Sequence, residues 1–429
     1  MPTTAKRARG ANAKLAFAFG DEYDTPPDEG SYWQLPFISS ALGAEQALEA
    51  DDTLGQGRGM NDPSDSNITN TGDVVVPVDV RNIGVWYKLF MGDPTTVALD
   101  HATGSAKLSA QPAANSTFTV NGTAFTFVAA DPEGNEILIG ADVDATSTAI
   151  AAALNASVVA GVAQATYAAA DDTVTINYDA AGLAGNAFTL AASADAHLEL
   201  SGPTLTGGTV KHTFVSEAED LPAGFAEIQK PDVLRFGMNR QIRGGKCAIA
   251  VSPKGKLNAT CSLVAKGEDL ANESACGDLT NMDVLRFSQA FGEITREGVA
   301  MGQVVSASVN YDNSLDTVEV VRNDAEIEDA DPGSSVASGD VVVRLSDANK
   351  DIPTGQNNPC GLTYGWTVPG TNFSLKYTIP RAFLPRVKDS ITGPGGIQKT
   401  YSWQSSSPDE GHTLTVELVN DVANYNNPA

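Results

Sequence analysis

Carboxylates are the side chains of this sequence most able to do chemistry, and they are densest between Asp312 and Gly333. This stretch holds eight Asp and Glu residues and a single basic residue, Arg322. Closely spaced carboxylate oxygens can bind Ca²⁺. The group to consider contains Asp324, Glu326, Glu328, Asp329 and Asp331. It lacks the spacing, the glycine and the terminal Glu of an EF-hand loop, so the sequence favours a solvated acidic loop and predicts no metal site.

The other residues able to do chemistry form no known catalytic or cofactor-binding pattern. The four histidines, His101, His197, His212 and His412, are scattered and have no neighbouring Cys or His. There is no G-x-S-x-G elbow, no Walker Gly-Lys-Ser/Thr and no H-E-x-x-H. A glycosidase would need two acids about 5 to 9.5 Å apart in a cleft, and few aromatics are present to stack on sugars. The sequence predicts a protein that is not an enzyme and that needs no cofactor.

The cysteines also lack metal-ligand spacing, because Cys247, Cys261, Cys276 and Cys360 include no C-x-x-C pair. Cys247 and Cys261 lie symmetrically about Lys254, so they would face each other if that segment forms a hairpin turn. Facing residues on paired strands can approach disulfide distance. Synthesis in the cytoplasm keeps thiols reduced, so we expect two small buried side chains instead of a bond.

Charge and composition limit the possible partners and the fold class. The net charge of −26 and the pI near 4.3 would repel nucleic acid and anionic membrane surfaces. Such a surface suits a solvated particle, or a wall to which polyanions do not adhere. A chain of 429 residues is too long to fold around a single hydrophobic core, so two or three domains are expected. With 40 Gly and only 7% aromatic residues, a mainly β protein follows.

The elements that carry the acidic stretch are repeated along the chain. Gly339-Asp340-Val341-Val342-Val343 follows it, and Gly72-Asp73-Val74-Val75-Val76 follows an earlier acidic run through Glu49, Asp51 and Asp52. Upstream, Tyr32 to Ser40 precedes the first acidic run as Gln303 to Asp312 precedes the second. Two hairpin-like segments, starting at Cys247 and Phe383, also correspond. Because the order of features is kept, we predict two halves with one shared fold.

Each half is expected to be an antiparallel β sandwich or barrel with about one helix. In the first half, Tyr32 to Ser40 is a predicted strand, and Gly43 to Asp73 is a predicted long polar loop. A helix is predicted from Arg81 to Gly92, where Ile83, Trp86, Tyr87 and Phe90 share one face, Asn82 could cap the start and Gly92 the end. Asp316 to Ser338 is the corresponding loop of the second half, Glu268 to Thr280 is read as a linker, and Thr413 to Val419 as the last strand.

The window from Ala106 to Gly208 has a composition of its own. It contains 28 Ala, ten carboxylates and one Lys, and it has no Arg, Cys, Trp or Met. Asn121-Gly122 between two alternating runs is a strong hairpin signal. Further predicted elements are strands at 136–140, 165–167, 173–178 and 188–191 and a helix from about Thr146 to Asn155. We expect a small α+β domain inserted into the first half, which resumes at His212.

The N-terminus has the basic start of an export signal but too few apolar residues after it. We therefore expect synthesis and folding in the cytoplasm and no membrane segment. Lys6, Arg7, Arg9 and Lys14 form either an arm that docks on an acidic neighbour or a solvated tail.

Several strings of this sequence resemble the tail tube proteins of long-tailed bacteriophages. They are Ala8 to Phe19, Gly72 to Asp79, Phe287 to Gln289, Ile294 to Gly298, Ile327 to Gly333 and Gly393 to Gln398. The resemblance covers both halves but not the Ala-rich window. That window is itself similar to a module of other phage tail proteins, through Asn121-Gly122, Ala153 to Ser157 and Ala184 to Phe188. None of these strings is a catalytic signature.

The resemblance implies a structural virion protein that forms stacked rings around a channel through which DNA passes without specific binding. Its partners would be further copies of itself and other tail proteins at the tube ends. Two tandem repeats per chain imply a trimeric ring with pseudo-sixfold symmetry, a hexamer of the whole chain being the alternative. The expected division is 1–105 and 209–285 for the first tube domain, 106–208 for an outward-facing insert, and 286–429 for the second tube domain. A secreted adhesin or Ca²⁺-dependent β-sandwich module is the alternative from another class, disfavoured by the missing signal peptide.

The long loops are the candidate contacts between subunits or rings, because loops of this length in compact domains are usually functional. The candidate residues are Glu49, Asp51, Asp52, Arg58, Asp62, Asp324, Glu326, Glu328, Asp329 and Asp331.

Overall fold

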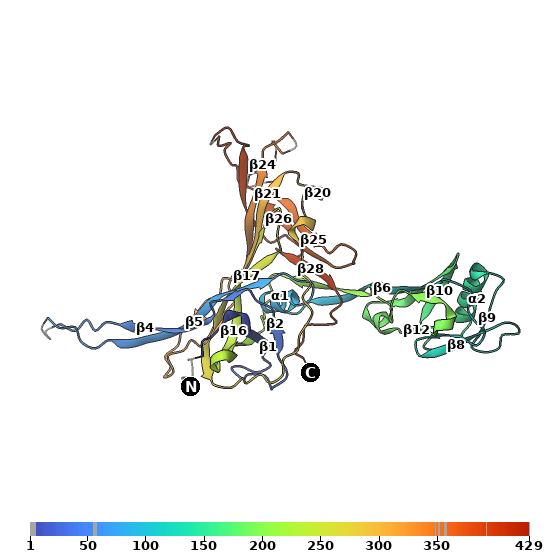
Figure 1. Ribbon diagram of the computed structural model, residues 1–429. Coiled ribbons are helices and arrows are strands. Elements are labelled where there is room, and N and C mark those ends of the chain that lie inside the picture. Colours follow the sequence, from blue (N-terminus) through green and yellow to red (C-terminus); the bar gives the residue numbers. More distant parts are fainter. Residues whose placement is uncertain are drawn as a thin grey trace.

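The computed structural model describes residues 6–54, 58–347, 349–350, 352–355, 358–391 and 393–428. The chain is mainly β, with antiparallel pairing almost throughout, as the sequence predicted. Figure 1 shows a central body with three extensions. A narrow hairpin of β4 and β5 projects on one side, a unit carried on β6 projects on the other, and the second half of the chain rises above.

The first half builds a sheet in which six strands lie in the lateral order β4, β5, β17, β16, β15, β1. Every neighbouring pair in this order is antiparallel. The strands are β1 (Lys14–Phe19), β4 (Gly43–Glu49), β5 (Ser64–Pro77), β15 (Gly224–Lys230), β16 (Arg235–Val251) and β17 (Asn258–Ala265). A seventh strand, β18 (Gly267–Ala271), pairs with the first part of β16.

The second half repeats this arrangement strand for strand, in the lateral order β21, β24, β27, β26, β25, β19. All of these pairs are antiparallel as well. The strands are β19 (Gly292–Arg296), β21 (Val304–Asp312), β24 (Val336–Arg344), β25 (Cys360–Thr367), β26 (Ser374–Phe383) and β27 (Gln398–Ser405). The last strand, β28 (Thr415–Asn420), pairs with the first part of β26, as β18 does with β16. Corresponding strands of the two halves follow the same order along the chain and the same order across the sheet. The tandem repeat expected from the sequence is therefore present in the topology.

The two repeats are joined edge to edge through β16 and β21. β16 continues beyond its pairing with β15, and its last residues pair antiparallel with β21 from Lys246 opposite Asp312 to Val251 opposite Ala307. The sheet therefore runs without interruption from β4 of the first repeat to β26 of the second. It does not close into a barrel, because no ladder among the described residues joins β19 or β20 (Val299–Ala300) to β21. The barrel alternative is thus wrong for the single chain.

The helix predicted between Arg81 and Gly92 is α1 (Ile83–Met91), and all nine of its residues are buried. Gly92, with φ of 82°, ends it as predicted. Asn82 does not cap the helix with its side chain. The buried Asp79 carboxylate caps the start of the helix instead, since its Oδ1 accepts hydrogen bonds from the backbone N–H groups of Arg81 at 2.9 Å and Asn82 at 2.8 Å. The helix packs on one face of the first sheet, with Phe90 against Gly244.

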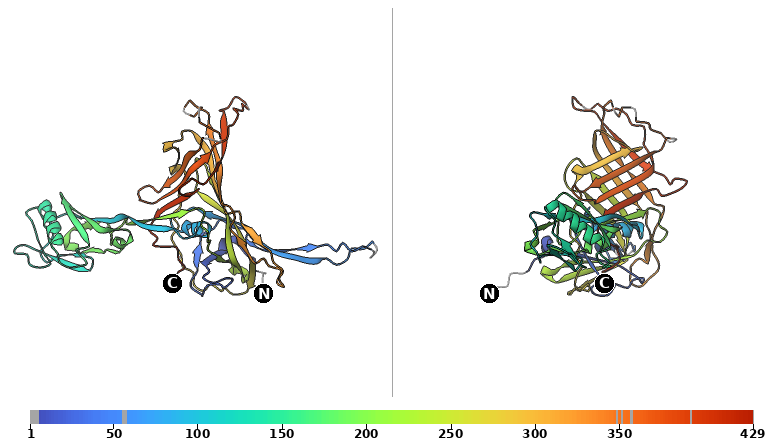
Figure 2. Two further views of the ribbon diagram at one scale, coloured as in Figure 1. Left: turned by 180° about the vertical axis from the view of Figure 1, so that it is seen from behind. Right: turned by 90° about the vertical axis from the view of Figure 1, so that its right-hand side faces the viewer.

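The Ala-rich window has its own hydrophobic core, which runs from Ala102 to Leu205 and includes Phe118, Ile150 and Phe188. The large core of the two repeats has no member between Met91 and Phe214. The unit is attached to the body through the long strand β6 (Thr95–Leu108), which pairs with β14 (Thr209–Val215). Figure 2 shows the unit well separated from the body. It contains α2 (Val143–Asn155) and the strands β7 (Thr117–Val120), β8 (Thr123–Val128), β9 (Glu136–Leu138), β10 (Ala165–Ala170), β11 (Thr173–Ala181), β12 (Leu190–Ala192) and β13 (Leu198–Leu200).

Three segments differ from the sequence prediction. Of the segment from Gly43 to Asp73, residues 43–49 and 64–73 form the β4–β5 hairpin instead of a loop, and 55–57 lie outside the described residues. The outer part of the hairpin has few buried positions because solvent surrounds both of its faces. The predicted linker begins with strand β18, and the loop from Asp316 contains the short pair β22 (Asp316–Val318) and β23 (Asp329–Asp331).

Two further predictions need correction. Pro36 interrupts the strand expected from Tyr32 to Ser40, which leaves β2 (Trp33–Leu35) and β3 (Ser39–Ser40), because proline has no N–H to donate to a ladder. The described part of the second half contains no α-helix, and the 3₁₀ turn at Gln289–Phe291 does not replace it, because this turn precedes β19 whereas α1 follows β5.

Candidate assembly surfaces

One polar pair recurs at the same place in both repeats. In the first, Ser262 Oγ on β17 donates to Asp73 Oδ1 on β5 at 2.6 Å. In the second, Ser402 Oγ on β27 donates to Asp340 Oδ1 on β24 at 2.5 Å. These residues are direct partners in the two ladders. The sequence analysis did not single out this pair, although the repeated Gly-Asp-Val-Val-Val strings contain both acids and were the available signal.

The joined sheet has one apolar and one polar face. Val74, Cys261 and Val341 point into the large core, while Asp73, Ser262 and their equivalents alternate with them and point away. Lys246 and Asp312, which face each other at the junction of the repeats, belong to the polar face. α1 packs on the apolar face, because its residues belong to the large core.

Two stretches along the edges of the sheet lack a strand partner among the described residues. All of β4 except Gly43 is exposed, and among the described residues its only strand partner is β5. At the other end, the chain leaves β26 at Phe383, and 384–391 have no strand partner although β27 continues beside them. Asp389 in this segment pairs with Lys399 of β27 at 2.6 Å. Unpaired edges of this kind are templates for pairing with another chain.

The candidate residues of the first acidic run lie on or beyond the outer end of the β4–β5 hairpin. Ser66 donates to Glu49 at 2.7 Å, and Asp51 accepts from Thr53 N at 2.9 Å and from Asn61 at 2.9 Å. Hydrogen bonds from Thr53 lower the pKa of Asp51. In the described part of the chain, Asp52, Arg58 and Asp62 have no ion-pair partner. The hairpin is a two-stranded ribbon, and a ribbon alone is only marginally stable in water.

The second acidic segment lies elsewhere, and two of its acids, Glu326 and Asp329, pair with cations of the first repeat. Arg243 donates to both oxygens of Asp329, at 2.9 and 2.7 Å. Arg240 contacts Glu326 at 2.7 Å and Asp24 at 2.5 Å, and Lys266 pairs with the same two acids. The segment therefore holds the two repeats together within one chain. The structure does not bring it to the outer end of the hairpin, where the first group lies.

Asp324 and Glu328, the other two candidate acids with a basic partner, both form ion pairs with Arg322. It contacts Asp324 at 2.9 Å and Glu328 at 2.9 Å, and its hydrogen bonds lower the pKa of Asp324 to about 2. For Asp329, burial favours the protonated form, but the hydrogen bonds from Arg243 outweigh it, so the pKa is lowered. Asp331 has no ion-pair partner among the described residues.

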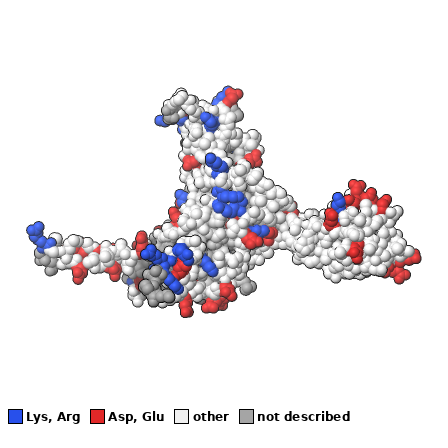
Figure 3. Space-filling model, in the orientation of Figure 1, with Lys and Arg blue, Asp and Glu red and all other residues white. Residues whose placement is uncertain are grey.

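The basic N-terminal segment forms an ion pair within the chain through Arg9. Arg9 lies 3.3 Å from Asp232, and Asn12 donates to the same carboxylate at 2.8 Å. Elsewhere on the surface, Figure 3 shows Asp and Glu side chains gathered on the 102–205 unit, with most Lys and Arg on the body.

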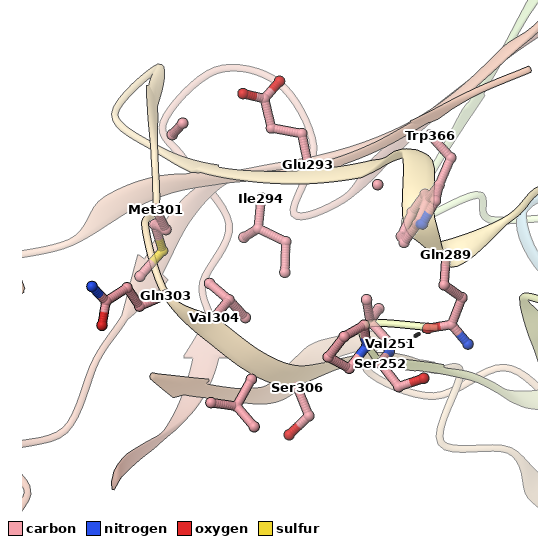
Figure 4. A pocket seen from close by; sticks show the side chains of 14 residues that line it. Val251, Ser252, Gln289, Glu293, Ile294, Met301, Gln303, Val304, Ser306 and Trp366 are labelled. Carbon is pink, nitrogen blue, oxygen red and sulfur yellow. Dashed lines mark hydrogen bonds between the residues drawn. The ribbon is translucent and has the colours of Figure 1, made fainter. Parts of the chain in front are cut away.

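The described residues can be compared with the requirements of a metal site and of a glycosidase. They contain no group of three or more His, Cys, Asp and Glu placed to hold a metal. A cavity of about 280 Å³ opens between β19–β20 and β21, and its lining includes Ile294, Met301, Val304 and Trp366 (Figure 4). Its lining holds a single carboxylate, Glu293, so it lacks the acid pair that a glycosidase requires.

The buried His212, Cys247 and Cys261 lie within the packed strands of the repeats. His212 lies between Thr96 and the Val422 carbonyl, and burial lowers its pKa. Cys247 and Cys261 are opposite each other in the β16–β17 ladder, as predicted, and both are free thiols. Burial raises the pKa of Cys261 well above its usual value, which disfavours the thiolate form.

A family model described as phage tail tube protein matches residues 10–405, which covers the six strands of each repeat and the Ala-rich unit that interrupts the first repeat. The chain belongs to the phage tail tube protein family. No curated protein matches the sequence. As a tail tube protein, the chain is a structural component of the virion tail that assembles with copies of itself. No helix among the described residues is long and apolar enough to span a membrane.

Proposed function

We propose that this tail tube protein polymerises into stacked rings of three copies with pseudo-sixfold symmetry. The observation that carries the proposal is the β16–β21 pairing, which joins two sheets of identical strand order within one chain. Three copies would supply six such sheets, and a contact repeated head to tail can close into a ring. The alternative is a ring of six whole chains, with the second repeat partly outside the wall.

The polar face of the joined sheet would line the channel. Asp73 and Asp340 occupy equivalent places on it, so a ring of three chains would present six equivalent carboxylates to the lumen. Negative charge on the wall repels the phosphate backbone, so DNA would slide through during ejection without specific binding. The opposite face carries α1 and the large core, which would form the body of the wall.

The proposed domain division is 1–105 with 209–285, 106–208, and 286–429. The separate core of the Ala-rich unit and its attachment through β6 and β14 support this division. We place the unit on the outside of the tube, because 103 extra residues in the lumen would block DNA, whereas a surface position tolerates a long insertion. The unit interrupts only the first repeat, so it would project three times per ring.

The outer end of the β4–β5 hairpin would contact an adjacent ring. An exposed ribbon with acids at its end gains stability by packing on a neighbour. Glu49, Asp51, Asp52, Arg58 and Asp62 are the residues proposed for this contact. Further tail proteins would bind the two ends of the tube, where the same surfaces remain uncovered.

Electron microscopy of the concentrated protein tests the proposal. The expected result is tubes whose end-on views show three outer lobes and a sixfold inner wall, with Asp73 and Asp340 toward the channel. Six outer lobes per ring would contradict the trimer, and a protein that stays monomeric at high concentration would contradict ring formation itself.

A further inference from the structure

The junction between the two repeats is a template for a contact between copies. In it, the end of β16 pairs with β21 so that Lys246 lies opposite Asp312 and Val251 lies opposite Ala307. If repeats follow one another around a ring, the end of β26 must meet the first strand of the next copy in the same way. The structure allows the residues on both sides of that contact to be identified.

The first strand of the next copy corresponds to β21 with no shift in register. In the second repeat, Ala307 pairs with Val341 and Asp312 with Val336. In the first repeat, Ser40 pairs with Val74 and Glu45 with Thr69. The displacement along the sequence is the same for all four pairs and for Asp73 and Asp340. Glu45 is therefore the equivalent of Asp312, and Ser40 is the equivalent of Ala307.

The end of β26 can be matched to the end of β16 by the neighbouring ladder. Arg243 pairs with Val264 in the first repeat, and Phe383 pairs with Gln404 at the corresponding place in the second. Counting onward from these positions, Arg386 corresponds to Lys246, so both repeats carry a cation here. Pro385 corresponds to Gly245, at which the register of the β16–β17 ladder shifts. A proline is tolerated at such a bulge because its missing N–H is not needed there.

Neither segment has a strand partner at the edge in question among the described residues, although the outward-facing Ala44 N–H donates to Glu268 Oε2 at 3.1 Å. Arg386 and Ser390 are exposed, and 386–391 have no strand partner in the described structure. Glu45 is exposed on the free edge of β4. Neither Arg386 nor Glu45 has an ion-pair partner among the described residues. The edges therefore agree in length, register and charge, with a cation on one and an anion on the other.

We propose that Arg386–Ile391 of one copy pairs antiparallel with Ser40–Glu45 of the next copy, with Arg386 opposite Glu45. This pairing extends the sheet from chain to chain and orders the segment after β26. It rests on the proposed ring-forming function and names the surfaces that make the ring.

A charge exchange tests this pairing. Arg386→Glu and Glu45→Arg each place like charges opposite each other at every interface, which disfavours cross-strand pairing. Each single variant is expected to fold as the wild type does, because both side chains are exposed, and to need about fivefold or more protein to form tubes. The double variant restores opposite charges at each interface and should assemble near the wild-type concentration. Lys107→Glu, an exposed charge reversal on the 102–205 unit, is the matched control and should assemble normally.

Hydrogen exchange provides the second measurement. Amides of 386–391 should exchange quickly in the monomer and become protected in the tube. The inference is overturned if folded single variants assemble like the wild type, if the double variant fails to recover, or if these amides stay unprotected in tubes. Absence of tubes from the wild type would instead refute the proposed function, so the two failures can be told apart.

Discussion

At the scale of single residues, the Arg243–Asp329 pair is the strongest candidate for a contact that fixes one repeat on the other. The two side chains are only 19% and 16% exposed, and two hydrogen bonds join them. Asp329→Asn should lower the free energy of unfolding by about 1.5–3 kcal/mol at pH 7, the range for hydrogen bonds to charged groups. Because the pKa of Asp329 is lowered by folding, its stabilisation is present above the unfolded pKa of about 3.9 and disappears as the pH falls through the folded value.

Urea denaturation of the monomer at pH 7 and near pH 3 measures both effects. The difference between wild type and Asp329→Asn should shrink at the lower pH. Asp324→Asn, whose partner Arg322 is on the same exposed segment, is the control and should cost less at pH 7. An equal loss at both pH values would show that the Asp329 carboxylate charge does not matter.

At the scale of elements, the β4–β5 hairpin distinguishes a free subunit from an assembled one. Few buried contacts support its outer part, so it should open locally at little cost. Trypsin is expected to cut after the exposed Arg58 early in the monomer and slowly in the tube, where a neighbouring ring covers it. Mass spectrometry of the fragments checks this, with Arg58→Gln as the variant that removes the site. Equal cleavage in monomer and tube would argue against a contact by this hairpin.

At the scale of the whole molecule, the Ala-rich unit should be dispensable for the tube. Its core shares no residue with the core of the repeats, and β6 and β14 already pair at Asp100 and Thr209. Replacing 101–208 by an Asn-Gly turn should leave a folded protein that forms tubes without outer lobes. Microscopy and the unfolding transition measure this outcome. An unfolded or unassembled product would show that the unit contributes to the body.

The sequence by itself determined the features that depend on neighbouring residues. Alternation of apolar residues marked most strands, the stripe from Ile83 to Phe90 marked α1, and Asn121-Gly122, both with positive φ, marked a hairpin. The repeated Gly-Asp-Val-Val-Val strings indicated two copies of one topology, because the same local pattern folds into the same strand.

Only the tertiary structure decided what depends on distant pairing. β4 is exposed on both faces, and its few apolar residues do not alternate with polar ones, so the sequence pattern does not reveal a strand that pairs with β5 in solvent. The capping role of Asp79 and the partners of Asp329 depend on residues brought together by folding. The edge-to-edge joining of the repeats was likewise hidden, because which strand edges are covered is a property of the sheet and not of any strand's own sequence.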